Sequence, residues 1–165
     1  TTHTATTTAT GVSDPHSVAI DLVNHRLYVA DTGNHRVLEY DLDTNDDLVD
    51  HTADTVIGQT DFTSSTSGTT ATTLNSPVGV AYDAVNDRLF IADRQNYRVL
   101  VYDSASTLPA NNAAADHVLG QSNFTSNTAA SLTATSSTET WQLSALIDGV
   151  MLHKWRWCTS RIPLT

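Results

Sequence analysis

The chain has 165 residues, which is enough for one domain with a buried core, and its formal net charge is −10. Lys154 is the only lysine, and no basic stripe is present that could neutralise phosphates, so we expect neither a nucleic acid nor an anionic membrane surface as a partner. The single cysteine, Cys158, excludes an internal disulfide, and no apolar run is long enough to cross a bilayer.

Residues 1–14 are rich in threonine and follow no clear period. A stretch of similar composition, residues 68–76, occurs 62 residues after residues 6–14. We therefore interpret residues 1–14 as the end of a connection from an earlier repeat. The sequence contains no signal peptide, so any targeting signal is expected upstream of it.

From residue 15 the sequence consists of two copies of one unit, residues 15–76 and 77–138. A proline opens each unit, and the later landmarks recur at an offset of 62 residues, such as residues 31 and 93, 36 and 98, and 41 and 103. Self-similarity at a fixed period is typical of repeat architectures such as propellers. The two units should therefore have the same fold.

The pattern of apolar segments in each unit predicts four short strands. The first three are apolar segments separated by turn-forming residues, and the fourth is a short outer strand that ends at a glycine. The predicted strands are Val18–Asp21, Leu27–Ala30, Arg36–Tyr40 and Val56–Ile57, followed by Val80–Asp83, Leu89–Ala92, Arg98–Tyr102 and Val118–Leu119. The near-continuous apolar runs at 27–30 and 89–92 indicate strands that are covered on both faces. The sequence therefore predicts an all-β fold with two four-stranded antiparallel sheets.

The turn between the second and third strands carries the same three polar residue types in both units. They are Asp31, Asn34 and Arg36 in the first unit, and Asp93, Asn96 and Arg98 in the second. Asparagine tolerates a positive φ, so we predict that each asparagine occupies the left-handed position of its turn. The aspartate can accept hydrogen bonds from turn amides and can meet the arginine. These six residues are therefore predicted to be structural rather than functional.

A lone phenylalanine recurs in the polar segment after the fourth strand, as Phe62 and Phe124. We predict that each fills a small satellite core beneath the long connection; a ligand-binding role is the alternative.

The repeat pattern stops after residue 138. Glu139 stands where a third unit should open with proline, and all three Trp, the only Met, the only Cys and the only Lys lie in residues 139–165. We interpret this segment as an atypical tail in place of a third sheet, which would be partial or broken. A reading-frame error or a truncated gene end would explain it, and a divergent terminal repeat is the alternative.

The opening proline, the four strands and the turn Asp-x-Gly-Asn-His-Arg resemble the NHL repeat, in particular its long-period bacterial form. The Asn-His-Leu that names this family corresponds to residues 34–36 and 96–98, although Tyr97 replaces the histidine in the second unit. The resemblance implies a β-propeller in which each repeat forms most of one blade. Propellers contain roughly four to eight blades, so we expect a propeller fragment whose partners include further blades. Alone, it should associate through its exposed blade faces.

In such a propeller, the turns between the second and third strands share one face with the long connections between units. His35, Arg94 and Tyr97 lie in these turns at positions where the two units differ, so they are the candidate ligand-binding residues. Ordinary solvated turn residues are the alternative interpretation. No catalytic residue, metal site or cofactor is predicted, because the seven histidines lack the spacing of a metal site and no nucleophile or phosphate-loop motif occurs.

Two function classes remain open. The first is a non-catalytic binding or scaffolding module, part of an extracellular or cell-surface bacterial propeller that presents its loops to a protein or carbohydrate ligand. The second, which the family resemblance implies, is a fragment of a propeller enzyme of the lyase or lactone-hydrolase type, with a channel metal site in the missing blades.

Overall fold

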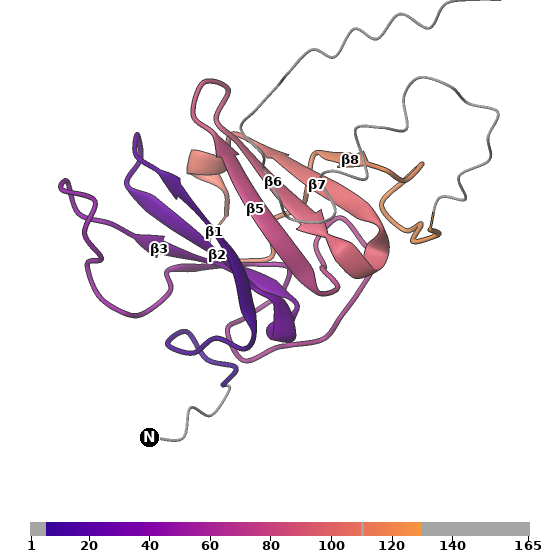
Figure 1. Cartoon of the computed structure of the whole chain (residues 1–165), viewed down its shortest axis with the longest axis horizontal. Coiled ribbons are helices and arrows are strands. Elements are labelled where there is room, and N and C mark those ends of the chain that lie inside the picture. Colours follow the sequence, from indigo (N-terminus) through magenta and orange to yellow (C-terminus); the bar gives the residue numbers. More distant parts are fainter. Residues whose placement is uncertain (1–5, 110, 130–165) are drawn as a thin grey trace, which may run out of the picture.

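The computed structural model describes residues 6–109 and 111–129, which form two four-stranded antiparallel sheets (Figure 1). The first sheet consists of β1 (Pro15–Asp21), β2 (Arg26–Asp31), β3 (Arg36–Asp41) and β4 (Thr55–Ile57). The second consists of β5 (Pro77–Asp83), β6 (Arg88–Asp93), β7 (Arg98–Asp103) and β8 (His117–Leu119). Within the described residues, three short 3-10 helices accompany them: η1 (Thr32–Asn34), η2 (Arg94–Asn96) and η3 (Ala105–Thr107).

The strands of each sheet lie in chain order, as in a blade of a β-propeller. The predicted all-β fold with two antiparallel sheets is therefore confirmed. The atypical tail, residues 139–165, lies outside the described residues. In the described part of the chain, no helix has the length and apolar character needed to cross a membrane.

The two sheets repeat each other in register. Asp31 pairs with Arg36 across the first hairpin, and Asp93 pairs with Arg98 across the second. Each sheet also opens with a proline followed by a register shift. Proline suits this first strand position because it has no N–H to donate to the ladder.

The main core lies in the seam between the sheets. β1 and β2 make the contacts with β5, and Figure 1 shows β1 and β5 beside each other where the two sheets meet. Fully buried side chains from both sheets line the seam: Tyr28, Ala30, Val37, Ile57, Leu89, Ile91, Leu100 and Tyr102. A single four-stranded sheet cannot bury an apolar face by itself, so this seam supplies burial that neither sheet has alone.

The prediction that the second strand of each unit is covered on both faces is only half right. In β2, Tyr28 is buried in the seam, whereas Leu27, which points to the opposite face, is half-buried. In β6 the situation is reversed, because Leu89 is buried and Phe90 is half-buried. The two copies therefore meet through opposite faces of the same repeat. Within the described residues, no further sheet covers the remaining two faces.

The turn between β2 and β3 corrects one prediction. The left-handed conformation belongs to His35 (φ 54°) and Tyr97 (φ 51°), not to Asn34 and Asn96. Each asparagine instead lies in its 3-10 turn, where its Nδ2 donates to an oxygen of the preceding aspartate at 2.9 Å and 2.8 Å. These bonds hold the asparagine in the right-handed turn, so the residue after it closes the turn.

The connection after the fourth strand begins at a glycine with positive φ in both units, 93° at Gly58 and 87° at Gly120. The glycine predicted at the end of the fourth strand therefore forms a bend. A Cβ added to Gly58 would lie 2.6 Å from Cδ1 of Leu74, so both the φ angle and the close approach require glycine there. Phe62 packs beneath this connection on a small separate core, as predicted, whereas Phe124 packs on the main core.

Candidate functional site at the hairpin end

A buried ion pair lies at the hairpin end of each sheet. Arg36 Nε donates to Asp31 Oδ2 at 2.6 Å, and Arg98 Nε donates to Asp93 Oδ2 at 2.7 Å. All four side chains are completely buried. Removing two charges from water is costly unless additional hydrogen bonds satisfy the groups that remain. The surroundings of these pairs supply such bonds.

The remaining guanidinium nitrogens donate to backbone carbonyls of the long connections. Arg98 Nη1 donates to Phe124 O at 2.5 Å, and Nη2 donates to Thr70 O at 2.8 Å and Thr73 O at 2.9 Å. Arg36 repeats this arrangement with the carbonyls of Phe62, Thr8 and Gly11. Each arginine therefore joins the connection that precedes its sheet to the one that follows it.

The aspartates bind the chain just before the first strand of their sheet. Asp31 Oδ1 accepts from Ser13 N at 2.6 Å, and Asp93 Oδ1 accepts from Asn75 N at 2.7 Å. The prediction that the aspartate accepts from amides of its own turn holds for the side-chain amides of Asn34 and Asn96. The backbone amides that it binds belong instead to the incoming segment. Burial raises the pKa of Asp93, against the hydrogen bonds from Asn96, Asn75 and Arg98 that lower it.

Two side chains of the first hairpin reach across the seam to the second sheet. Thr32 Oγ1 donates to Pro77 O, and His35 Nδ1 accepts from Ser76 N at 3.0 Å. A histidine nitrogen can accept only when it carries no proton, so this bond requires His35 to be neutral with its proton on Nε2. The same two positions in the second hairpin are Arg94 and Tyr97, and both are exposed.

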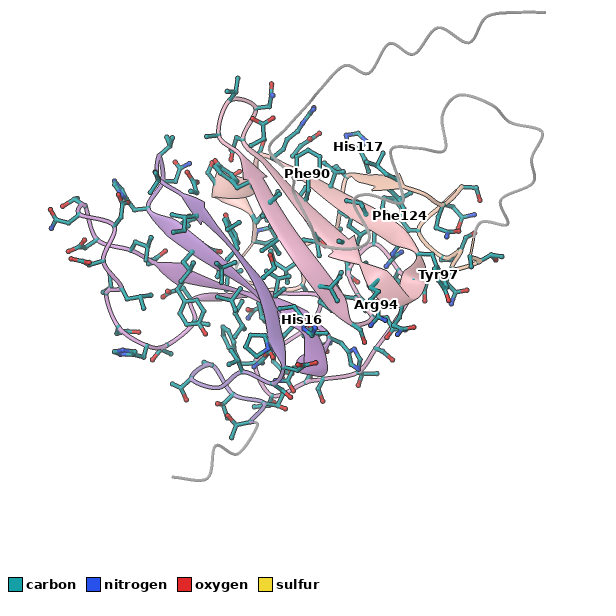
Figure 2. The ribbon with its side chains drawn as sticks, viewed as in Figure 1. His16, Phe90, Arg94, Tyr97, His117 and Phe124 are labelled. Carbon is teal, nitrogen blue, oxygen red and sulfur yellow. The ribbon has the colours of Figure 1, made fainter. Side chains whose placement is uncertain are left out.

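The three predicted ligand-binding residues lie at one end of the molecule but in different surroundings. His35 is half-buried in the seam, whereas Arg94 and Tyr97 are exposed at the η2 end of the second sheet (Figure 2). The connection from 59 to 76 lies at this end as well. Gln59 Nε2 donates to His35 O at 3.1 Å, and Asn96 Nδ2 donates to Gly68 O at 2.8 Å.

Sequence reasoning missed a polar network at the opposite end, where the β1–β2 and β5–β6 turns lie. Tyr82 Oη donates to Asp87 Oδ1 at 3.0 Å and accepts from Asn24 Nδ2 of the first sheet at 3.4 Å. Ser106 Oγ donates to Asp87 Oδ2 at 2.6 Å. The available signal was a difference between the units, because Ile20 and His25 stand where the second unit has Tyr82 and Asp87.

Sequence reasoning also missed an ion pair within the first sheet. Arg26 Nη1 lies 2.8 Å from Glu39 Oε1, and the Glu39 side chain is almost fully buried. Burial raises the pKa of Glu39, and the neighbouring Arg26 opposes that shift. Val101 replaces this glutamate in the second unit, so the pair is not part of the repeat. Over residues 6–109 and 111–129, no three His, Cys, Asp or Glu side chains are grouped so that they could hold a metal ion.

The loop after Gln59 gives a testable pH dependence. Asp61 Oδ1 accepts from the backbone N and the hydroxyl of both Thr63 and Ser64. These hydrogen bonds lower the pKa of Asp61 from its ordinary 3.8 to about 2. A lowered folded-state pKa means that the stabilising contribution is complete above pH 3.8 and is lost as the pH falls through about 2. We expect loop 61–64 to loosen in this window.

The second unit supplies the control, since Asn123 makes the same bonds with Thr125 and Ser126 and does not titrate. NMR amide shifts of Thr63 should move between pH 4 and pH 2 while those of Thr125 stay constant, and Asp61→Asn should abolish the first change. Equal movement at both threonines would contradict the prediction.

The sequence profile described as NHL repeat matches residues 13–40 and 74–102, one segment in each sheet. No curated protein matches the chain. Among solved structures, a nidogen/laminin complex is similar at 22% identity with a TM-score of 0.41; the match covers 58% of this chain and 29% of that one. A luciferin-regenerating enzyme is similar at 17% identity with a TM-score of 0.44, covering 67% of this chain and 31% of that one. The chain thus spans about a third of the length of either structure.

Proposed function

The chain belongs to the NHL repeat family, and from this premise we propose that it is a binding and scaffolding module without catalytic residues of its own. It forms part of an extracellular or cell-surface bacterial propeller and presents its hairpin end to a protein or carbohydrate ligand. The observation that supports this proposal is that the hairpin end is rigidly held yet carries Arg94 and Tyr97 exposed. Binding residues commonly lie on loops that a rigid scaffold positions.

Rigidity comes from the two buried ion pairs, which fix the hairpins and the connections beside them. A preformed surface loses little conformational entropy when a ligand binds. Tyr97 offers an aromatic face with a polar tip, and Arg94 offers planar hydrogen-bond donors. These groups suit sugar rings and peptide carbonyls. A sequence rich in Thr, Ser, Asn and Asp also suits a solvated extracellular surface.

The test compares two ends of the same sheet. The double variant Arg94→Ser/Tyr97→Ser should reduce binding to a panel of surface glycans and extracellular proteins at least tenfold. The control is Val85→Ser at the opposite end, where the side chain is 90% exposed, and it should leave binding unchanged.

Loss of binding in the control but not in the double variant would contradict the proposed surface. Metal analysis of the full-length protein addresses the enzyme class. Stoichiometric, tightly bound Ca²⁺ or Zn²⁺ together with hydrolase or lyase activity would replace this proposal with the enzyme.

A further inference from the structure

The outward face of the first sheet is the copy of a face that the second sheet buries. We call it the head face and define it by Val18, Ile20, Leu27, Val29 and Tyr40, whose side chains share one side of β1–β3. The residues 62 positions later are Val80, Tyr82, Leu89, Ile91 and Tyr102, and all of them contribute to the core in the seam.

The side chains of the head face are more exposed than their counterparts in the second sheet, because no sheet of the described residues covers them. Val18 is 62% exposed, whereas its counterpart Val80 is 8% exposed. Ile20 is 50% exposed, whereas its counterpart Tyr82 packs against the core. The same strand position is therefore apolar in both units but is covered only where another sheet lies against it. Contiguous exposed apolar side chains of this kind mark an interaction surface.

The outward face of the second sheet corresponds, in the repeat, to the face that the first sheet buries in the seam. We call it the tail face and define it by Phe90, Ala92 and Leu119. Their counterparts 62 positions earlier are Tyr28, Ala30 and Ile57, which line the seam from the first sheet. Phe90, labelled in Figure 2, and Ala92 are half-buried, and Leu119 is 46% exposed. Aromatic, small and aliphatic side chains thus occupy the same positions on both surfaces.

We propose that the tail face of one copy of this chain binds the head face of a second copy, in the way that the first sheet packs against the second within the chain. In the internal seam the corresponding residues of the repeat pack against each other, so the contact between copies repeats an interface of the same kind. Two different surfaces meet, so a pair of copies still has one head face and one tail face free, and assembly proceeds to a ring or an open chain. A ring of three copies would contain about six sheets, within the usual range for propellers.

The contact between copies should be weaker than the internal seam. Inside the chain, Val80 N donates to Ser17 Oγ at 3.3 Å across the seam. The residue of the second sheet that corresponds to Ser17 is Gly79, which has no hydroxyl. The connection from 59 to 76 also joins the internal pair covalently, whereas two copies must lose translational freedom to meet. Association should therefore depend on concentration and rest on apolar contact.

The experiment uses the full chain in analytical ultracentrifugation over a concentration series. Wild type should associate, and either Val18→Asp on the head face or Leu119→Asp on the tail face should raise the apparent dissociation constant at least 100-fold. An equal mixture of the two variants should form a dimer, because one copy retains an intact tail face and the other an intact head face. Val85→Asp, an equally polar change at a valine outside both faces, should associate like wild type.

Circular dichroism must show that each variant is folded, and the exposure of Val18 and Leu119 makes this the expected result. A monomeric wild type at all concentrations would overturn the proposal. So would loss of association in Val18→Asp alone, with no dimer in the mixture, because the head face would then bind itself or an occupant other than the tail face.

Discussion

Replacing Arg98 with Met is expected to lower the free energy of unfolding by about 3–5 kcal/mol, the range for breaking a buried ion pair on one side. The substitution leaves the Asp93 carboxylate buried without its charged partner. It also removes the donors to three backbone carbonyls, those of Phe124, Thr70 and Thr73. Methionine fills much of the space but donates no hydrogen bond. Urea unfolding at pH 7, followed by far-UV circular dichroism, measures the loss.

Arg88→Met is the matched control. Arg88 Nε donates to Asp103 Oδ1 at 2.7 Å, so the donor atom and the distance are the same as in the Arg98–Asp93 pair. The side chains of Arg88 and Asp103, however, are 45% and 36% exposed. Solvent screens such a pair, so its loss should cost less than about 1 kcal/mol. If both variants lost the same free energy, burial and the carbonyl bonds could not be the source of the larger effect.

The strand positions could be predicted because the repeat supplies each pattern twice. A short apolar run such as 27–30 is ambiguous alone, but its recurrence at 89–92 between the same turn residues identifies it as a strand. Local chemistry also placed proline at the start of a strand and glycine at the bend. These features depend on a few neighbouring residues, so sequence carries them.

The conformation of the hairpin turn could not be predicted in the same way. Asn34 and His35 both tolerate a positive φ, and the choice between them depends on side-chain bonds across the chain. Asn34 Nδ2 donates to Thr6 O at 3.1 Å, and Asp31 accepts from Ser13 N. Both partners belong to a segment that precedes the sheet. The position of this segment next to the turn depends on the tertiary fold, so local sequence does not predict it.

The candidate site shows the same limit. The sequence indicates that residues 32, 35, 94 and 97 vary on a common frame, but not what each position contacts. Thr32 and His35 reach across the seam, because the second sheet lies next to them. Arg94 and Tyr97 are exposed. Equivalent residues therefore acquire different surroundings from their order along the chain. Periodicity alone does not reveal which copy lies next to a neighbour.

Replacing Leu74 with Ala tests how much the seam contributes to stability. Leu74 belongs to the connection between the sheets and is completely buried in the main core. Its side chain also lies against the position where Gly58 would carry a Cβ, so the surroundings are tightly packed. Truncating a buried leucine leaves a cavity, and we expect a loss of about 2–5 kcal/mol in the free energy of unfolding.

Val12 occupies the same repeat position before the first sheet, and it is 37% exposed. Val12→Ala should therefore change stability by less than about 1 kcal/mol, although both residues hold equivalent places in the repeat. The two unfolding curves should be measured at low protein concentration, where association between copies does not contribute. A large loss from Val12→Ala under these conditions would mean that the first sheet is covered without a partner copy. The head face of the first sheet would then not need a second copy of the chain to cover it. The expected difference between the two substitutions arises because one position has a neighbouring sheet and the other does not.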